Sequence, residues 1–330
     1  MTTGTSNAGV LAPALLVTLA LPSTWPLALA TFLLRGGIVV VALPILVLPT
    51  TVGIGNAIGP ALTVIAFGSF PPELVVVVAA VVVVALVWLV AGGWLAAFVE
   101  VEEVQIVAAD EEFAGLEGPA VARRSSRSSS RRVAGRIFVA RLIAALPLSV
   151  VLAIGSVRLV FVTYRELTAP ADVSTPILLR VLMASPEVVV AVAVAWMAAE
   201  IVGALAARRL AVTDAGIGVG LRTALAMWRQ QPISTLVRFV VPTVVLLLVL
   251  VPSTLAAAAV FDAMAEVLDG RPDPIGTVLA VTALVAVWAI SLLLTSVVCA
   301  WRAAVWTVAA AAPARDIRVV PEPPTGSLVR

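Results

Sequence analysis

Six long apolar stretches dominate the pattern of hydrophobic and polar positions along the chain. They lie near residues 33–52, 74–98, 139–162, 187–206, 239–260 and 276–300. Each reaches or approaches the roughly 20 apolar residues that a helix needs to cross a bilayer. The run LVVVVAAVVVV at 74–84 is too long for a strand and lacks alternation, and an open sheet cannot satisfy its backbone in lipid. The pattern therefore predicts an all-α polytopic membrane bundle with six transmembrane helices.

The arginines predict how these helices are oriented. All 21 basic residues of the 330-residue chain are arginines. Arg35, the seven at 123–141, the five at 208–238 and the four in the tail from Arg302 all fall on one predicted side. Because cytoplasmic loops retain Arg and Lys, both termini are predicted to be cytoplasmic. We expect a multi-pass protein of the bacterial plasma membrane.

Recurring anchor residues predict three hairpin repeats. Arg35 is followed 14 residues later by Pro49, and Arg238 is followed 14 residues later by Pro252. A proline opens each returning span and a tryptophan follows within it, in the pairs Pro72 and Trp88, Pro186 and Trp196, and Pro274 and Trp288. We therefore predict an interfacial helix and first hairpin at 1–99, a cytoplasmic linker at 100–138, a second hairpin at 139–207, an amphipathic helix and third hairpin at 208–312, and a disordered tail at 313–330.

Several shorter segments outside the spans are predicted to be helical. The apolar segment 10–21 has two interpretations, the core of a signal peptide or a short helix on the inner face, and the lack of a preceding positive charge favours the helix. Segment 214–231 begins at a candidate N-cap, Thr213 or Asp214, and has Leu221, Leu225 and Trp228 on one helical face. Segment 253–269 is expected to be a separate amphipathic helix that ends at Gly270.

The predicted linker 100–138 divides into an acidic part and an Arg/Ser-rich part. The low-complexity Arg/Ser-rich part can bury too little apolar surface to fold by itself, so it is predicted to be a disordered tether. Phosphate on Ser125, Ser126 or Ser128 would cancel much of the nearby arginine charge, which makes these serines candidates for a phospho-switch of membrane attachment. The alternative is a plain tether.

Composition narrows the chemistry. The chain is 62% hydrophobic and 12% charged, about half the charged fraction of a soluble domain. It has no Lys and no His, so it lacks the residues for a Walker phosphate loop, a Schiff base or a Ser-His-Asp triad. Its one cysteine, Cys299, lies in an apolar run. We therefore expect no enzymatic activity, no cofactor, no metal and, at a net charge of +2, no nucleic-acid partner.

Glu200 is singled out as the one acid placed well inside a predicted span. A carboxylate in hydrocarbon must pair, protonate or face water, so an intramembrane site is one interpretation. The other is an interfacial carboxylate paired to an arginine of the same or a neighbouring repeat, such as Arg208. Candidate contacts for anionic lipid are the arginines of the inner face, namely Arg208, Arg209, Arg222, Arg229 and Arg238. Ordinary positive-inside decoration explains these arginines equally well.

The segment Ala226-Met227-Trp228-Arg229-Gln230-Gln231-Pro232, followed by a span, resembles that of uncharacterised bacterial multi-pass proteins. One such group is the membrane domain that accompanies some glycerophosphodiester phosphodiesterases. The resemblance is one of architecture over most of the chain. It implies a helical membrane domain and no reaction.

Two functions fit these patterns. The first is a membrane scaffold or regulatory subunit that contacts anionic lipid and a protein partner or a second copy of itself. The small residues Gly92, Gly93 and Gly203 suit close helix packing of this kind. The alternative is a permease or channel subunit with a path near Glu200 and the Gly-rich connection 53–68. A polar cavity that reaches Glu200 would favour the permease, and a dry, filled bundle would favour the scaffold.

Overall fold

The computed structural model describes residues 8–41, 72–108, 127–169, 174–213, 215–269 and 274–311, together with a few positions between 59 and 68. Within these residues 95% are helical and none lies in a strand. The elements are α1 (Ala8–Ala20), α2 (Thr24–Phe32), the π-helical segment η1 (Leu33–Gly37), α5 (Pro72–Ala108), α7 (Arg127–Thr168), α8 (Ile177–Met183), α9 (Pro186–Thr213), α10 (Ile217–Gln230), α11 (Pro232–Asp269) and α12 (Pro274–Ala311).

Six helical segments are long and apolar enough to cross a membrane. They are Thr24–Val41, Val75–Val107, Ser130–Thr168, Pro186–Val212, Pro232–Val267 and Pro274–Ala310. The sequence prediction of an all-α polytopic bundle with six such helices is therefore confirmed. The first segment begins earlier than the predicted 33–52, and residues 42–52 of that prediction lie outside the described residues. The class of protein that this fold defines is a multi-pass helical membrane protein.

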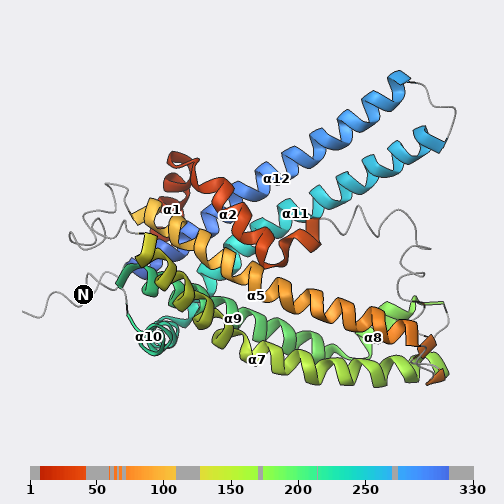
Figure 1. The fold of residues 1–330 in the computed structure, drawn as a ribbon, viewed down its shortest axis with the longest axis horizontal. Coiled ribbons are helices and arrows are strands. Elements are labelled where there is room, and N and C mark those ends of the chain that lie inside the picture. The colour runs from red at the N-terminus through yellow and green to blue at the C-terminus, as the bar shows by residue number, and fades with distance from the viewer. Residues whose placement is uncertain are drawn as a thin grey trace, which may run out of the picture.

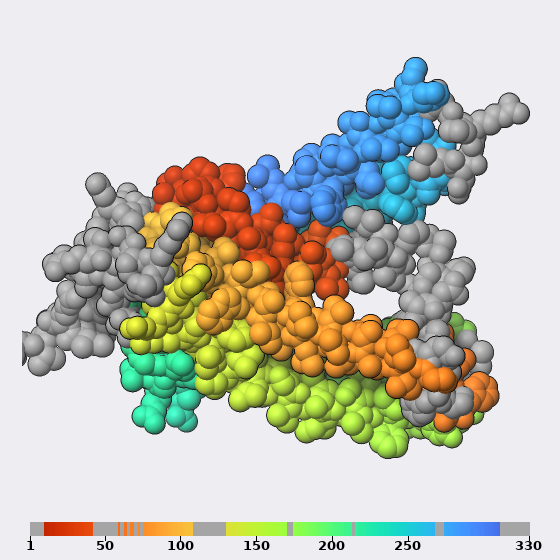
Figure 2. All heavy atoms as spheres, in the orientation of Figure 1, coloured from red at the N-terminus to blue at the C-terminus, as the bar shows by residue number. Residues whose placement is uncertain are grey.

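The long helices run antiparallel to their neighbours in the chain. Figure 1 shows α7 beside α9, with α5 along the same side, while α11 and α12 form a second antiparallel pair. The far ends of α11 and α12 diverge from those of α7 and α9, and this pair projects from the space-filling surface in Figure 2. Helices α1 and α2 pack on α12, and α2 also contacts α5. The second and third predicted hairpins thus correspond to the antiparallel pairs α7 with α9 and α11 with α12, and the three-hairpin repeat stays a prediction.

Burial divides the bundle lengthwise into two halves. The packed half comprises 96–107 of α5, 130–140 of α7, 201–210 of α9 and 299–310 of α12, where most apolar side chains are buried. The apolar half comprises 75–90 of α5, 142–161 of α7 and 275–294 of α12, where most large apolar side chains are exposed. Lipid is the solvent that makes such exposure favourable. Both described ends of the chain lie in the packed half, because Val10 and Ala14 of α1 pack on Ala304 and Val305 of α12.

Several predicted boundaries are wrong in the structure. Helix α5 continues to Ala108 and α7 begins at Arg127, so both ends of the predicted linker 100–138 are helical. The predicted separate helix at 253–269 is the continuation of α11 across Pro252. The segment 10–21 does form a helix, α1. It contains Pro13, and Trp301 Nε1 of α12 donates a hydrogen bond to Leu11 O at 3.1 Å.

The inner amphipathic helix also differs in detail from its prediction. Helix α10 starts at Ile217 after Gly216, rather than at Thr213 or Asp214. Its buried face centres on Gly220 and Ala224, and the side chain of Leu210 lies against Gly220, 3.1 Å from where a Cβ would be. The predicted stripe is therefore rotated. Leu221 and Trp228 pack on the core, whereas Leu225 is exposed.

Candidate functional site

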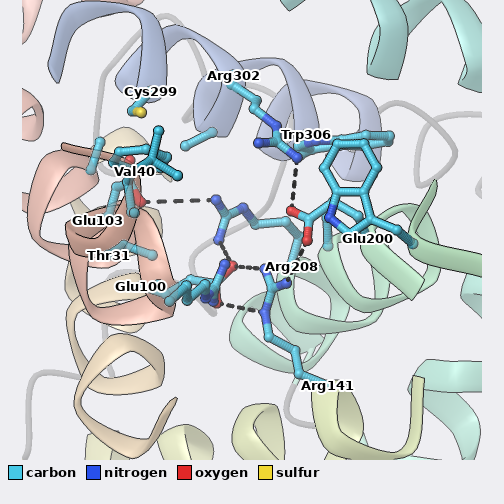
Figure 3. Close-up of a pocket in the computed structure, with 18 residues that line it drawn as sticks. Thr31, Val40, Glu100, Glu103, Arg141, Glu200, Arg208, Cys299, Arg302 and Trp306 are labelled. Carbon is cyan, nitrogen blue, oxygen red and sulfur yellow. Dashed lines mark hydrogen bonds and ion pairs between the residues drawn. The ribbon is translucent and has the colours of Figure 1, made fainter. Parts of the chain in front are cut away.

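Glu100 is the centre of a buried group of charges in the packed half. Its side chain on α5 is 1% exposed and accepts hydrogen bonds from arginines of three other elements. Arg35 of η1 donates to Oε2 and Arg208 of α9 donates to Oε1. Arg141 of α7 donates through Nε to Oε2 at 3.0 Å and through Nη2 to Oε1 at 2.6 Å, which is the bidentate geometry that guanidinium and carboxylate favour. Figure 3 shows Glu100 between Arg141 and Arg208.

Two further carboxylates extend the group. Glu200 of α9 lies 3.0 Å from Nη2 of Arg302 on α12 and 3.9 Å from Nη1 of Arg141. Glu103, one turn beyond Glu100 on α5, lies 3.9 Å from Nη2 of Arg208 and is buried. We call these seven side chains the charged cluster: Arg35, Glu100, Glu103, Arg141, Glu200, Arg208 and Arg302. They come from five elements that are far apart in the chain.

Small residues let these elements approach closely enough to pair their charges. A Cβ on Gly92 of α5 would lie 2.9 Å from the backbone oxygen of Leu34, so only glycine allows η1 to pack here and bring Arg35 to Glu100. A Cβ on Gly203 of α9 would lie 3.5 Å from Nη1 of Arg141. Ala97 and Ala204 are fully or almost fully buried in the same core. Close approach through small residues is how helices pack in membranes, where water supplies no driving force.

The charged cluster lines a cavity of about 350 Å³. Its polar and aromatic wall also includes Thr31 and Phe32 of α2, Trp196 of α9, and Cys299 and Trp306 of α12. A volume of this size falls at the lower end of small-molecule sites. The cavity is thus a charged, ligand-sized space inside an otherwise apolar bundle.

Several polar atoms in the wall of this cavity are buried without a hydrogen-bond partner. They are Thr31 Oγ1, Glu103 Oε1, Arg208 Nε, Arg302 Nη2 and Trp306 Nε1. Arg302 Nη2 makes its ion pair with Glu200 at 3.0 Å without the angle of a hydrogen bond. An unmade bond of a buried polar group costs about 1–3 kcal/mol. A ligand or ordered water in the cavity would offset that cost.

A second, smaller space lies nearer the apolar half and is lined by residues of α11 and α12. It measures about 20 Å³, room for a single water, and lies between Val41, α11 and α12. Hydroxyl groups face it from both helices, those of Ser253, Thr254, Ser291 and Thr295. Thr295 lies one helical turn from Cys299 in the wall of the larger cavity. We call this space the hydroxyl gap.

The chemistry available at the site is that of ion pairing and hydrogen bonding. No group of three or more metal-ligating side chains occurs within the described residues. Cys299 is a free, buried thiol. The cluster offers guanidinium donors and carboxylate acceptors, the groups that bind and orient a polar ligand.

The structure distributes the predicted site residues unevenly. Glu200 is in the charged cluster, and its partners are Arg141 and Arg302 rather than Arg208. Of the candidate lipid contacts, Arg222 and Arg229 are exposed on α10, whereas Arg208 and Arg238 are buried and Arg208 serves the cluster. Arg209 Nη2 lies 3.8 Å from Met227 Sδ. Ser128 lies in the first turn of α7, and Ser125 and Ser126 fall outside the described residues.

Sequence reasoning missed Glu100 and Glu103 because it ended the second span at 98. A signal for the longer helix was present. Val101, Val104 and Val107 recur at three-residue spacing, and all three are buried. Glu200 is therefore not the one acid within a long apolar helix. Arg35, which anchors the first predicted repeat, donates to Glu100, and so does Arg141.

Comparison with protein-family models, curated proteins and solved structures gives no match for this chain. The resemblance to multi-pass proteins that accompany phosphodiesterases therefore stays a prediction. The case for function depends on the charged cluster and its cavity.

Proposed function

We propose that the protein is a solute-binding membrane protein, a permease or channel subunit whose path passes the charged cluster. The carrying observation is the cavity of about 350 Å³ that reaches Glu200 within a bundle of apolar helices. A scaffold has no need for such a space, and a filled bundle would have supported that alternative. Charged side chains at membrane depth are expensive, and they are typical of substrate and ion pathways.

The hydroxyl gap supports a path rather than a closed binding pocket. Ser291 and Thr295 donate to the carbonyls of their own helix at 2.7 Å, as hydroxyls in membrane helices commonly do. Their oxygen lone pairs remain available to a passing solute or water. At about 20 Å³ the gap is too narrow for a solute, so it is the closed part of the path. The larger cavity is the part that holds the solute.

Cysteine accessibility tests this path without knowledge of the solute. The chain has one cysteine, so Cys299→Ser gives a cysteine-free background. Ser291→Cys then places a thiol in the hydroxyl gap, and Ile290→Cys places one at the adjacent position, where the side chain is exposed on the apolar half. Both variants are reconstituted in liposomes and treated with a sulfonate-bearing methanethiosulfonate.

We expect Ser291→Cys to react at least about tenfold faster than Ile290→Cys, because the reactive species is the thiolate and it forms only where water reaches the sulfur. The neighbouring position controls for depth along α12. Equal rates, or protection of Ser291→Cys alone, would contradict a water-accessible path.

A further inference from the structure

The charges of the cavity wall do not balance. Four guanidinium groups and three carboxylates line it, those of Arg35, Arg141, Arg208 and Arg302 against those of Glu100, Glu103 and Glu200. Arginine stays protonated in proteins, so the wall carries at least one net positive charge. An uncompensated charge that is buried in the protein is unfavourable. The site is therefore suited to a ligand that brings negative charge.

The buried hydrogen-bonding groups without partners also indicate a negatively charged ligand. Arg208 Nε, Arg302 Nη2 and Trp306 Nε1 are buried donors without a hydrogen-bond acceptor, whereas Glu103 Oε1 is the corresponding carboxylate acceptor without a donor. Guanidinium and indole nitrogens cannot accept. The wall thus needs a ligand that is chiefly an acceptor.

Two of these donors lie close together on one helix. Arg302 and Trp306 are four residues apart, so they lie on the same face of α12. The guanidinium of Arg302 lies over the ring of Phe239, 5.8 Å from its centroid, and forms an ion pair with Glu200. These contacts fix its position, and a fixed guanidinium is the side chain that best recognises a planar or tetrahedral oxyanion.

We infer that the cavity binds an oxyanion, a carboxylate or phosphate group, which accepts hydrogen bonds from Arg302 and Trp306. This inference rests on the proposed function and names the solute class. The same chemistry has two sources, a free solute or the phosphate of a lipid headgroup. Both can reach the site, because it lies where the exposed apolar half of the bundle ends.

The test uses the full chain in nanodiscs of neutral phosphatidylcholine. Inorganic phosphate and acetate are titrated separately at constant ionic strength, with chloride as the non-oxyanion control, and tryptophan fluorescence and the midpoint of thermal unfolding are recorded. A second arm replaces part of the lipid with phosphatidylglycerol. Trp196 and Trp306 line the cavity, so occupancy changes the fluorescence.

Three variants assign the response to the site. Trp306→Phe removes one donor and keeps the ring, and we expect its affinity to fall about tenfold, the loss of one hydrogen bond to a charged group. Arg302→Gln should lower the affinity by at least that factor. Glu103→Gln removes a negative charge and should bind as tightly as wild type or more tightly. Arg165→Gln, at a side chain that is 65% exposed in the last turn of α7, is the matched control and is expected to change nothing.

Each outcome decides the inference. A saturable response to phosphate or acetate that Trp306→Phe weakens supports a free oxyanion, and a response confined to phosphatidylglycerol, with the same dependence, supports a headgroup. No Trp306-dependent response in either arm, or weaker binding by Glu103→Gln with stronger binding by Arg302→Gln, overturns the inference. The cysteine experiment is independent. If Ser291→Cys is labelled and the oxyanion titration gives no response, the path serves another solute and only the oxyanion inference fails. If the oxyanion binds and Ser291→Cys is not labelled, the cavity is an oxyanion site and only the proposed path fails.

Discussion

The two halves of α7 carry the same residue type in opposite surroundings. Ile137 in the packed half is completely buried, whereas Ile154 in the apolar half is 66% exposed. In α5 and α12, too, apolar side chains change from mostly buried to mostly exposed where the packed half meets the apolar half. The tertiary core therefore lies in one half of the bundle, and lipid covers most of the apolar surface of the other.

Composition explains the division. The packed half is rich in alanine, with glycine where backbones come closest, and it holds the charged cluster. The apolar half is built from valine, leucine and isoleucine, which bring no partner-specific contacts. In a membrane the hydrophobic effect does not distinguish a helix neighbour from an acyl chain. Specific association is left to small residues and to ion pairs. The charged cluster lies at one end, and a second set, Arg158 with Glu187 and Arg180 with Glu166, joins α7 to α9 and α8 toward the other.

The sharpest way to break this contrast is to remove the carboxylate at its centre. Glu100→Gln leaves Arg35, Arg141 and Arg208 without their shared acceptor. Breaking a buried charge network by removing one partner costs about 3–5 kcal/mol. We expect a loss of that size in the free energy of unfolding, measured by denaturant titration in detergent. Glu266→Gln, at an exposed position on α11, is the control and should leave the free energy unchanged. A Glu100→Gln protein as stable as the control would show that the cluster does not hold the helices together.

A second test compares the two isoleucines directly. Ile137→Ala creates a cavity in the packed half and should cost about 2–5 kcal/mol in the free energy of unfolding. Ile154→Ala exchanges one lipid-exposed apolar side chain for a smaller one and should change that free energy by less than about 1 kcal/mol. Equal losses in the same denaturant titration would mean that the apolar half is covered by protein, for instance by a second copy of the chain.

The apolar half is the part of the fold that sequence pattern could predict. Its runs of valine and leucine identify all the long helices, because a span is specified by composition over some 20 consecutive residues and by nothing distant. The first span is displaced for a local reason. Gly36 has a φ of 103° within η1, and the helix direction changes there, so the described segment Thr24–Val41 is not one straight helix.

The charged cluster could be predicted only in part. Glu200 could be identified because it lies in an apolar run. Its partners, Arg141 and Arg302, come from other helices, and local periodicity does not predict which helices become neighbours. Glu100 and Glu103 were assigned to a linker because acids usually mark the end of a span. Their burial depends on arginines that arrive from η1, α7 and α9. The cavity itself depends on how side chains fill space, which no motif encodes.

The smallest expected effect concerns the backbone beside Arg35. Gly36 adopts a left-handed conformation that an L side chain reaches at a cost of roughly 1–2 kcal/mol. A Cβ there would meet no atom within 4 Å, so Gly36→Ala tests conformation alone and should lower the free energy of unfolding by about that amount.

Gly218 on α10 is the matched control for Gly36. It also has open space around its Cβ position but lies within a helix at negative φ, so Gly218→Ala should raise the free energy of unfolding by about 0.4–1 kcal/mol. The two substitutions thus carry the same chemical change with opposite expected signs in one denaturant titration. Two losses would indicate that alanine disturbs packing at both sites. Two gains would mean that the helix runs straight through Gly36, and the approach of Arg35 to Glu100 would then need a different backbone.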